Sequence, residues 1–308
     1  MDILDLFNAL PGACASGLIW GIMAIGVFFT YKILDLADLT VDGTMSTGGA
    51  VCIMLMLSGC PVWIALLAAV GAGMLAGLVT GVLHTTMGIP AILAGILTQL
   101  GLYSVNLKIM GGSANKAISV DKYDLLVSLR HIKNVPFYQN TIVITIIILV
   151  VLIGILYWFF GTELGCSIRA TGSNERMACA QGINTNLRKV LGLMISNGIV
   201  AFASALYAQY QGFADVNAGR GAIVIGLAAV IIGEVAFGRL RKNFACVLGT
   251  VALGAIVYYI VIQIVLWLGL DSNYLKLLSA VVVAAFLAVP VMGEKWSIKR
   301  SYKEGGSH

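Results

Sequence analysis

Residues 32–47 read K-I-L-D-L-A-D-L-T-V-D-G-T-M-S-T and place three aspartates between two apolar runs, 9–31 and 44–58. A cytoplasmic loop between two spans should be basic, so this acidic stretch is not expected to lie at the membrane surface. Non-helical backbone is tolerated at membrane depth only where it is buried in protein or lines water. Gly43 suits a break in a helix. The stretch therefore predicts a discontinuous helix, broken near residues 35–47, inside a helical bundle.

The composition of the whole chain supports a membrane bundle. Of its 308 residues, 59% are apolar and only 11% are charged, with a mean hydropathy of +0.96, whereas soluble domains are about a quarter charged. A helical span needs roughly 20 apolar residues, and the 36 glycines permit close helix packing. We expect an all-α integral membrane protein with one domain, residues 1–308, and about eight or nine transmembrane helices. The apolar runs lie at 9–31, 44–58, 62–83, 89–107, 141–160, 190–212, 219–238, 243–268 and 274–292.

Lysine and arginine indicate the orientation, because basic residues concentrate in cytoplasmic segments. If the basic tail at 293–308 is cytoplasmic, alternation places the stretch 162–189 on the same side and the loop 108–140 outside. Twelve of the nineteen basic residues then lie inside: Lys32, Arg169, Arg176, Arg188, Lys189, Arg239, Arg241, Lys242, Lys295, Lys299, Arg300 and Lys303. The N-terminus is predicted outside, and the first span is expected to remain, because no basic segment of a signal peptide precedes it.

The chain shows no pattern typical of an enzyme. Its six cysteines include no C-x-x-C pair and its three histidines are far apart, so neither a metal site nor a disulfide framework is expected. The G-G-S-A-N-K stretch at 111–116 does not have the spacing of a phosphate-binding loop. We expect no catalytic residue and no cofactor in this chain, so any ATP would be hydrolysed by another subunit.

The acidic stretch supplies the candidates for a translocation pathway, since ionisable residues inside a membrane bundle are functional by default. The candidates are Asp38, Thr40, Asp42, Gly43 and Thr44. A broken helix exposes backbone groups, and its carboxylates can meet a polar solute. The alternative is that the aspartates cap the start of the next helix or face the cytoplasm.

The stretch 162–189 predicts a short amphipathic helix near residues 173–182, held between two turns. Asn174 suits the N-cap, Glu175 suits the positive helix N-terminus, and Gly182 suits the left-handed residue past the end. The helix carries a small apolar patch, Met177, Ala178 and Cys179. This patch is too small to anchor in lipid and favours a protein partner; the alternative is a solvated connection.

Three further charged residues have two interpretations each. Glu234, near the cytoplasmic end of a span, is a candidate gate, or an interfacial acid paired with Arg239. Asp215 and Arg220 flank an outer turn, where they pair or meet an extracellular partner.

Three stretches resemble the permeases of bacterial ABC importers of the branched-chain amino acid and ribose type. D-L-T-V-D-G-T-M-S-T-G-G-A-V at 38–51 is similar to the ribose permease pattern D-L-S-V-G-S followed by T-G-A-V. V-T-G-V-L at 79–83 with I-P-A-I-L-A at 89–94 resembles the next shared block. L-G-C-S-I-R-A-T-G-S-N-E-R-M-A-C-A-Q-G-I-N at 164–184 is similar to the loop that docks on the ATPase. The A-D-L-T-V-D-G form looks like the branch associated with tryptophan or tyrosine uptake.

The resemblance assigns roles residue by residue. It puts the coupling to the ATPase at Gly165, Arg169, Gly172, Asn174, Ala178, Gly182 and Ile183, and the pathway helix at Asp38, Thr40, Asp42 and Gly43. Compared with ribose permeases the chain lacks their first span, which agrees with an outside N-terminus. Asp42 and Gly43 stand near a position that is glycine followed by serine in the ribose pattern, so sugar specificity does not carry over.

The resemblance implies an importer of the bacterial inner membrane. Two permease chains, here a homodimer, form the pathway for a small solute. Two partner subunits bind ATP and Mg²⁺, and a binding protein outside delivers the solute, for which an amino acid is expected, with tryptophan or tyrosine first. Nucleosides and other small solutes are the first alternative. An ion-coupled secondary transporter, relaying through acids such as Asp38, is the second, and an assembly scaffold is the third.

Overall fold

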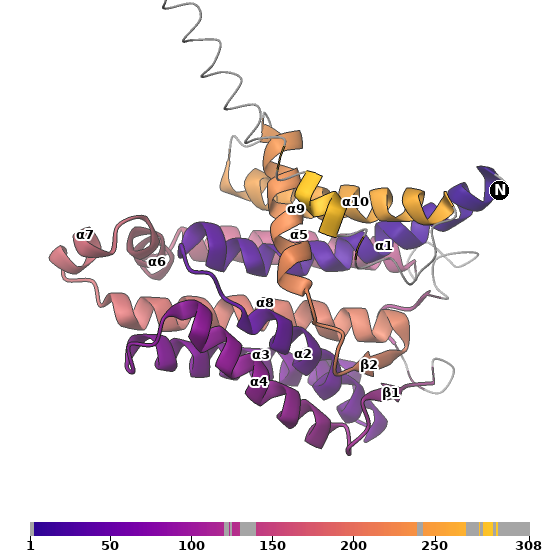
Figure 1. Cartoon of the computed structure of the whole chain (residues 1–308), viewed down its shortest axis with the longest axis horizontal. Helices are drawn as coiled ribbons and strands as arrows, with labels where there is room; N and C mark the ends of the chain where they lie inside the picture. The colour runs from indigo at the N-terminus through magenta and orange to yellow at the C-terminus, as the bar shows by residue number, and fades with distance from the viewer. Residues whose placement is uncertain are drawn as a thin grey trace, which may run out of the picture.

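The computed structural model describes residues 3–119, 123, 125–129, 140–238, 243–268, 277, 280–285 and 288. Within these the chain is almost entirely helical (Figure 1). The elements are α1 (Ile3–Phe28), the π-helical turn η1 (Phe29–Ile33), α2 (Thr40–Leu57), α3 (Val62–Thr85), α4 (Ala91–Ile109), β1 (Asn115–Ala117), α5 (Thr141–Phe160), α6 (Glu163–Ser173), α7 (Glu175–Ala180), α8 (Thr185–Gln211), β2 (Phe213–Asp215), α9 (Ala222–Ala236) and α10 (Phe244–Trp267).

Seven helices in the described residues are long and apolar enough to cross a membrane, and they confirm the predicted all-α class. They are α1 with η1, α2, α3, α4, α5, α8 and α10. The predicted span at 219–238 is shorter than expected. It contains only the 15 residues of α9, about 22 Å at 1.5 Å per residue, against a hydrocarbon core of about 30 Å.

α9 also differs from the long helices in direction. In Figure 1 it leaves the β2 connection near the middle of the bundle and runs across α1 toward α10. It begins beside α2, since the backbone N–H of Gly221 bonds to Asp42. Like α2, it therefore has its N-terminus inside the bundle.

Burial separates central helices from peripheral ones. In an 18-residue stretch of the span Ala9–Ile33, 83% of the residues are buried, and the corresponding share is 72% in both α2 and α8. In the most apolar span, α5, only 17% of such a stretch is buried, because leucine, isoleucine and valine that face lipid need no protein cover. α1, α2 and α8 therefore form the centre, where a polar side chain must find its partners within the protein.

The predicted break is present but shorter than expected. Helical backbone continues through η1 to Ile33, the chain is non-helical at residues 34–39, and α2 begins at Thr40. The break near residues 35–47 is confirmed, but Gly43, which the sequence suggests as the breaking residue, is not part of it. Gly43 lies in the first turns of α2, where a Cβ would press against Gln99 and Leu102 of α4. Gly43 therefore permits a close helix crossing.

α2 starts at mid-depth in the bundle. Its first turns contact Asn197, near the middle of α8, and Gly73 near the middle of α3 packs against that same asparagine. The non-helical residues 34–39 lead the chain back from the end of α1 to this level. The N-terminal N–H groups of α2 are thus directed into the interior of the bundle.

The close contact between α3 and α8, which we call the seam, predicts that alanine lowers stability at glycines of α3 that face α8 but not at a glycine that faces away. Gly73, Gly77 and Gly81 repeat at every fourth position and face α8, a spacing that allows close packing in membranes. A Cβ at Gly77 would overlap the carbonyl oxygen of Leu193, whereas a Cβ at Gly71 meets nothing within 4 Å. We expect Gly77→Ala to lower stability by about 1–3 kcal/mol, as overpacking does, and Gly71→Ala to have little effect. Thermal unfolding in detergent measures this, and equal losses would contradict the seam.

The two ends of the bundle differ. β1 pairs antiparallel with β2, with Asn115 opposite Asp215, and joins the segment after α4 to the end of α8. α6 and α7 lie at the opposite end in Figure 1.

Several predictions lie outside the described residues: the tail 293–308, most of the last span at 274–292, part of the loop 108–140, and the basic residues at 239–242.

Candidate functional site

Asp38 lies in a buried cluster of polar side chains at the start of α2. It is 2% exposed, and its two carboxylate oxygens accept hydrogen bonds from the Thr40 backbone N–H at 2.9 Å and from Asn197 Nδ2 at 2.7 Å. The first bond satisfies one of the free N–H groups at the start of α2. The second joins the break to the middle of α8.

Threonines extend this interior polar cluster across four helices. Thr44 donates to Asn197 Oδ1 at 2.7 Å. The Thr40 hydroxyl lies 2.7 Å from that of Thr80 on α3, which donates to Thr98 on α4 at 2.8 Å. All the side chains of the cluster are buried and bonded to one another, and buried polar networks of this kind fix a unique packing. The cluster therefore braces α2 against α3, α4 and α8.

Asp42 points to another side of α2 and binds the start of α9. Its Oδ2 accepts from the Gly221 backbone N–H at 2.9 Å, and its Oδ1 from the Ile223 N–H at 3.0 Å. α9 has no side-chain cap of its own at Gly221, so Asp42 supplies the negative charge that the helix N-terminus favours. Two interior helix ends therefore meet at one carboxylate.

A cavity of about 380 Å³ opens beside Asp42, between α2, α4 and the turn before α9. We call it the α2–α4 cavity. Its polar lining comes from Asp42, Ser46, Gln99, Tyr103, Asn106 and Arg220. This volume lies in the range of small-molecule sites, about 300–1,000 Å³. The cavity combines an acid, a base and two amides within a mainly apolar bundle.

The structure separates the predicted pathway residues into two groups. Asp42 and Gly43 line the α2–α4 cavity, whereas Asp38, Thr40 and Thr44 belong to the interior polar cluster. Sequence reasoning missed the cavity residues on α4, Gln99, Tyr103 and Asn106. The sequence does contain a signal for these three residues. They stand at positions i, i+4 and i+7, which lie on one helix face, and polar residues within a span mark functional sites.

The coupling segment contains two helices, where the sequence predicts one. α6 is capped by the Thr162 hydroxyl, which accepts from the Gly165 N–H at 3.3 Å. A Cβ at Gly165 would overlap the backbone of α5, and one at Gly172 would overlap the Ile33 carbonyl. The Arg169 guanidinium lies over the Phe244 ring, 5.6 Å from its centre. These residues hold α6 against the bundle.

α7 begins and ends with the capping residues that the sequence predicts. Asn174 Oδ1 accepts from the Met177 N–H at 3.0 Å, and Gly182 has φ +79°. The Ile183 N–H bonds to the Ala178 carbonyl at 3.1 Å, which completes a Schellman motif. Ala178 is buried and Met177 is 56% exposed. The helix therefore presents one methionine outward on a rigid frame.

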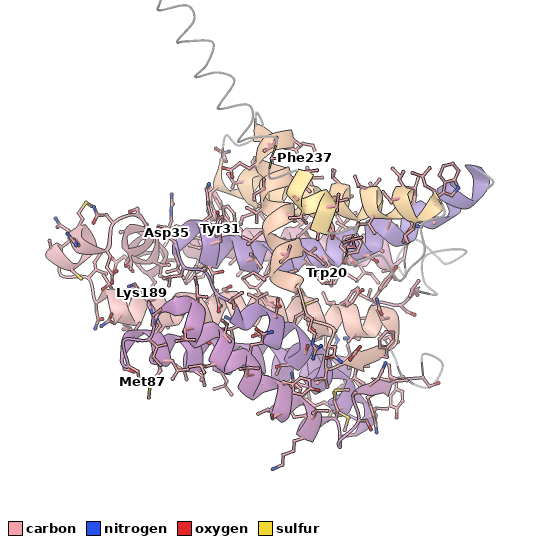
Figure 2. All side chains as sticks on the ribbon, in the orientation of Figure 1. Trp20, Tyr31, Asp35, Met87, Lys189 and Phe237 are labelled. Atoms are coloured by element: carbon pink, nitrogen blue, oxygen red, sulfur yellow. The ribbon has the colours of Figure 1, made fainter. Side chains whose placement is uncertain are left out.

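Glu175 joins α7 to the start of α8. Its carboxylate lies 2.6 Å from Lys189 Nζ, and the hydrogen bond from this lysine lowers the pKa of Glu175 below its ordinary value. Figure 2 shows Lys189, Asp35 and Tyr31 at the same end of the molecule, with Trp20 near its middle. α7 is thus connected to the end of the bundle where α1 turns back.

Glu234, the candidate gate, lies near the end of α9. Its carboxylate is 3.2 Å from Lys32 Nζ in η1, so it has a basic partner other than the one expected, Arg239, which lies outside the described residues. The two side chains are 35% and 46% exposed. The pair links the end of α9 to the turn that precedes the break.

A multi-pass bundle with helix ends, a polar cavity and a carboxylate in its interior defines a membrane transport subunit. Comparison with known proteins places the chain within this class. Residues 12–290 match the family described as the permease component of the branched-chain amino acid transport system, and the chain belongs to this family.

Three similar proteins illustrate the range of relatives. The tyrosine transport system permease protein of Clostridioides difficile is 39% identical over 91% of each chain. The ribose import permease of Escherichia coli strain K12 is 28% identical over 95% of this chain and 87% of its own. The solved complex of Streptococcus pneumoniae PsaBC with a Fab has a TM-score of 0.54 at 16% identity, covering 94% of this chain and 95% of that one. The last likeness concerns the fold alone.

Proposed function

We propose that this chain is the membrane-spanning permease of an ATP-driven ABC importer of the bacterial inner membrane. The observation that carries the proposal is α7, a capped helix with an exposed Met177 at one end of a bundle that belongs to a permease family. Such a helix suits docking on a partner subunit, since an exposed methionine is a common contact in protein interfaces. The same end is the cytoplasmic end in the orientation that the basic residues favour.

The chemistry that drives transport is supplied by other subunits. Two ATPase subunits bind ATP and Mg²⁺, and a second copy of this chain completes the pathway. A binding protein delivers the solute at the opposite end, where the β1–β2 sheet lies. ATP binding and hydrolysis favour different arrangements of the two halves, which is a population shift produced by differential contacts.

The solute is a small molecule of the amino acid class, with tyrosine or tryptophan first. The support is the 39% identity to a tyrosine transport system permease, which is well above the 28% to a ribose permease. The polar lining of the α2–α4 cavity, which includes both an acid and a base, suits a solute that carries both charges.

Copurification with the native partners tests the proposal. The tagged full chain is extracted from its own membrane, and the proteins that accompany it are identified. An ATPase and a binding protein are expected. The binding protein is then screened by thermal shift against amino acids and nucleosides. Stabilisation by an aromatic amino acid supports the assignment, and stabilisation by nucleosides alone would overturn it.

A further inference from the structure

The lining of the α2–α4 cavity includes an amide whose hydrogen-bonding capacity is unused. Asn106 is 0% exposed, lines the cavity, and in the described structure neither its Oδ1 nor its Nδ2 has a hydrogen-bond partner. A buried amide without partners costs about 1–3 kcal/mol of stability. A leucine at this site would pack without that cost, so the amide is explained if it serves a ligand.

Opposite charges line the same cavity. Arg220 is exposed, and in the part of the chain that the structure describes its guanidinium forms no ion pair. Asp42 accepts two backbone hydrogen bonds from the start of α9, but each carboxylate oxygen has a second lone pair for another donor. The cavity thus presents a cation and an anion that do not neutralise each other directly.

The neighbouring polar groups are neutral. Gln99 and Tyr103 lie on the same face of α4 as Asn106, and amides and hydroxyls orient a ligand without choosing its charge. A neutral sugar would need only such groups. The charged pair makes a zwitterion the better fit, since each of its charges meets an opposite one.

We infer that the α2–α4 cavity binds the head group of an α-amino acid. This inference rests on the proposed function and extends it to a recognition site within the permease itself. Arg220 binds the carboxylate, and Asp42 with Asn106 Oδ1 accepts from the ammonium. Asn106 Nδ2 donates to the carboxylate. The side chain of the amino acid lies toward the apolar lining at Leu100 and Val216.

The test measures binding to the full chain in its native assembly with the ATPase, purified in nanodiscs without the binding protein. Labelled L-tyrosine is the probe, with unlabelled L-tyrosine and tyramine, which lacks the carboxylate, as competitors. We expect saturable L-tyrosine binding and much weaker competition by tyramine. Arg220→Gln should weaken L-tyrosine binding at least about tenfold, the effect of losing one charged hydrogen bond, and leave tyramine competition nearly unchanged.

Asn106→Leu separates a ligand role from a structural one. If the amide serves a ligand, this variant loses L-tyrosine binding about tenfold and unfolds at the same temperature as wild type or higher, because an unsatisfied polar group is removed. Lys108→Gln is the matched control, since it removes a charge from the exposed last turn of the same helix and should bind normally. A lower unfolding temperature for Asn106→Leu with unchanged binding would overturn the inference.

Different experimental results would overturn the proposed amino acid site and the proposed function. Absence of saturable L-tyrosine binding to wild type, equal competition by tyramine, or normal binding by Arg220→Gln would each overturn the site. In each of those cases ATP-driven amino acid uptake by the complete assembly leaves the proposed function intact. An assembly that copurifies without an ATPase overturns the proposed function itself.

Discussion

Replacing Met177 with aspartate is expected to abolish ATP-driven uptake while leaving the bundle folded. The side chain is 56% exposed on α7, so the substitution disturbs little internal packing. It places a hydrated charge where a partner surface must desolvate it, and removal of a central interface contact costs about 2 kcal/mol or more. This corresponds to roughly a 30-fold loss of affinity for the ATPase. Copurification of the ATPase and ATP-dependent uptake in vesicles should fall together.

Met87→Asp is the matched control for this experiment. Met87 is 66% exposed and lies in the turn between α3 and α4, outside the coupling segment. Figure 2 places it at the same end of the molecule as Lys189. It should retain the ATPase and most of the uptake. If the two variants lose the ATPase equally, α7 is not the specific docking element.

Asp38→Asn is expected to destabilise the protein before it affects transport directly. The carboxylate accepts from both the Thr40 N–H and Asn197 Nδ2, and an amide can offer an oxygen to only one of them. The other donor is left unsatisfied in the interior, at a cost of about 1–3 kcal/mol. Scanning fluorimetry in detergent should show a lower unfolding temperature.

Asp35→Asn removes the same charge three residues away and is the control. Asp35 is exposed with φ +54°, and asparagine tolerates this left-handed conformation, so its stability should be near wild type. An Asp38→Asn variant with normal stability and no uptake would mean that Asp38 acts on the solute. In that case Asp38 would belong to the translocation pathway, as the sequence predicts, and its main role would not be to brace α2.

The helices of the fold were largely predictable, because a bilayer demands long apolar runs. The runs at 62–83 and 141–160 correspond closely to α3 and α5. The position of the break was predicted from its aspartates, but its length was not. Gly43 looked like a helix breaker, yet it lies within α2 because α4 passes close to it. A glycine that ends a helix and one that admits a neighbour have the same appearance in a sequence.

The candidate site was only half predictable. Local chemistry identifies Asn174 and Gly182 as helix caps, because capping depends on residues within a few positions of each other. The cavity instead unites Asp42, Asn106 and Arg220 from three distant segments, and only the packing of α4 and the α9 turn brings them together. The helix α6 was missed for a related reason, since its glycines suggest a loop but serve its contacts with α5 and η1.

Reconstituted transport is the most direct test of the central claim. The full assembly of permease, ATPase and binding protein is placed in liposomes, and accumulation of labelled L-tyrosine is followed with and without ATP. We predict uptake that requires ATP and the binding protein and persists when ionophores dissipate proton and sodium gradients. Uptake that continues without ATP and stops when those gradients are dissipated would contradict the account and identify an ion-coupled carrier.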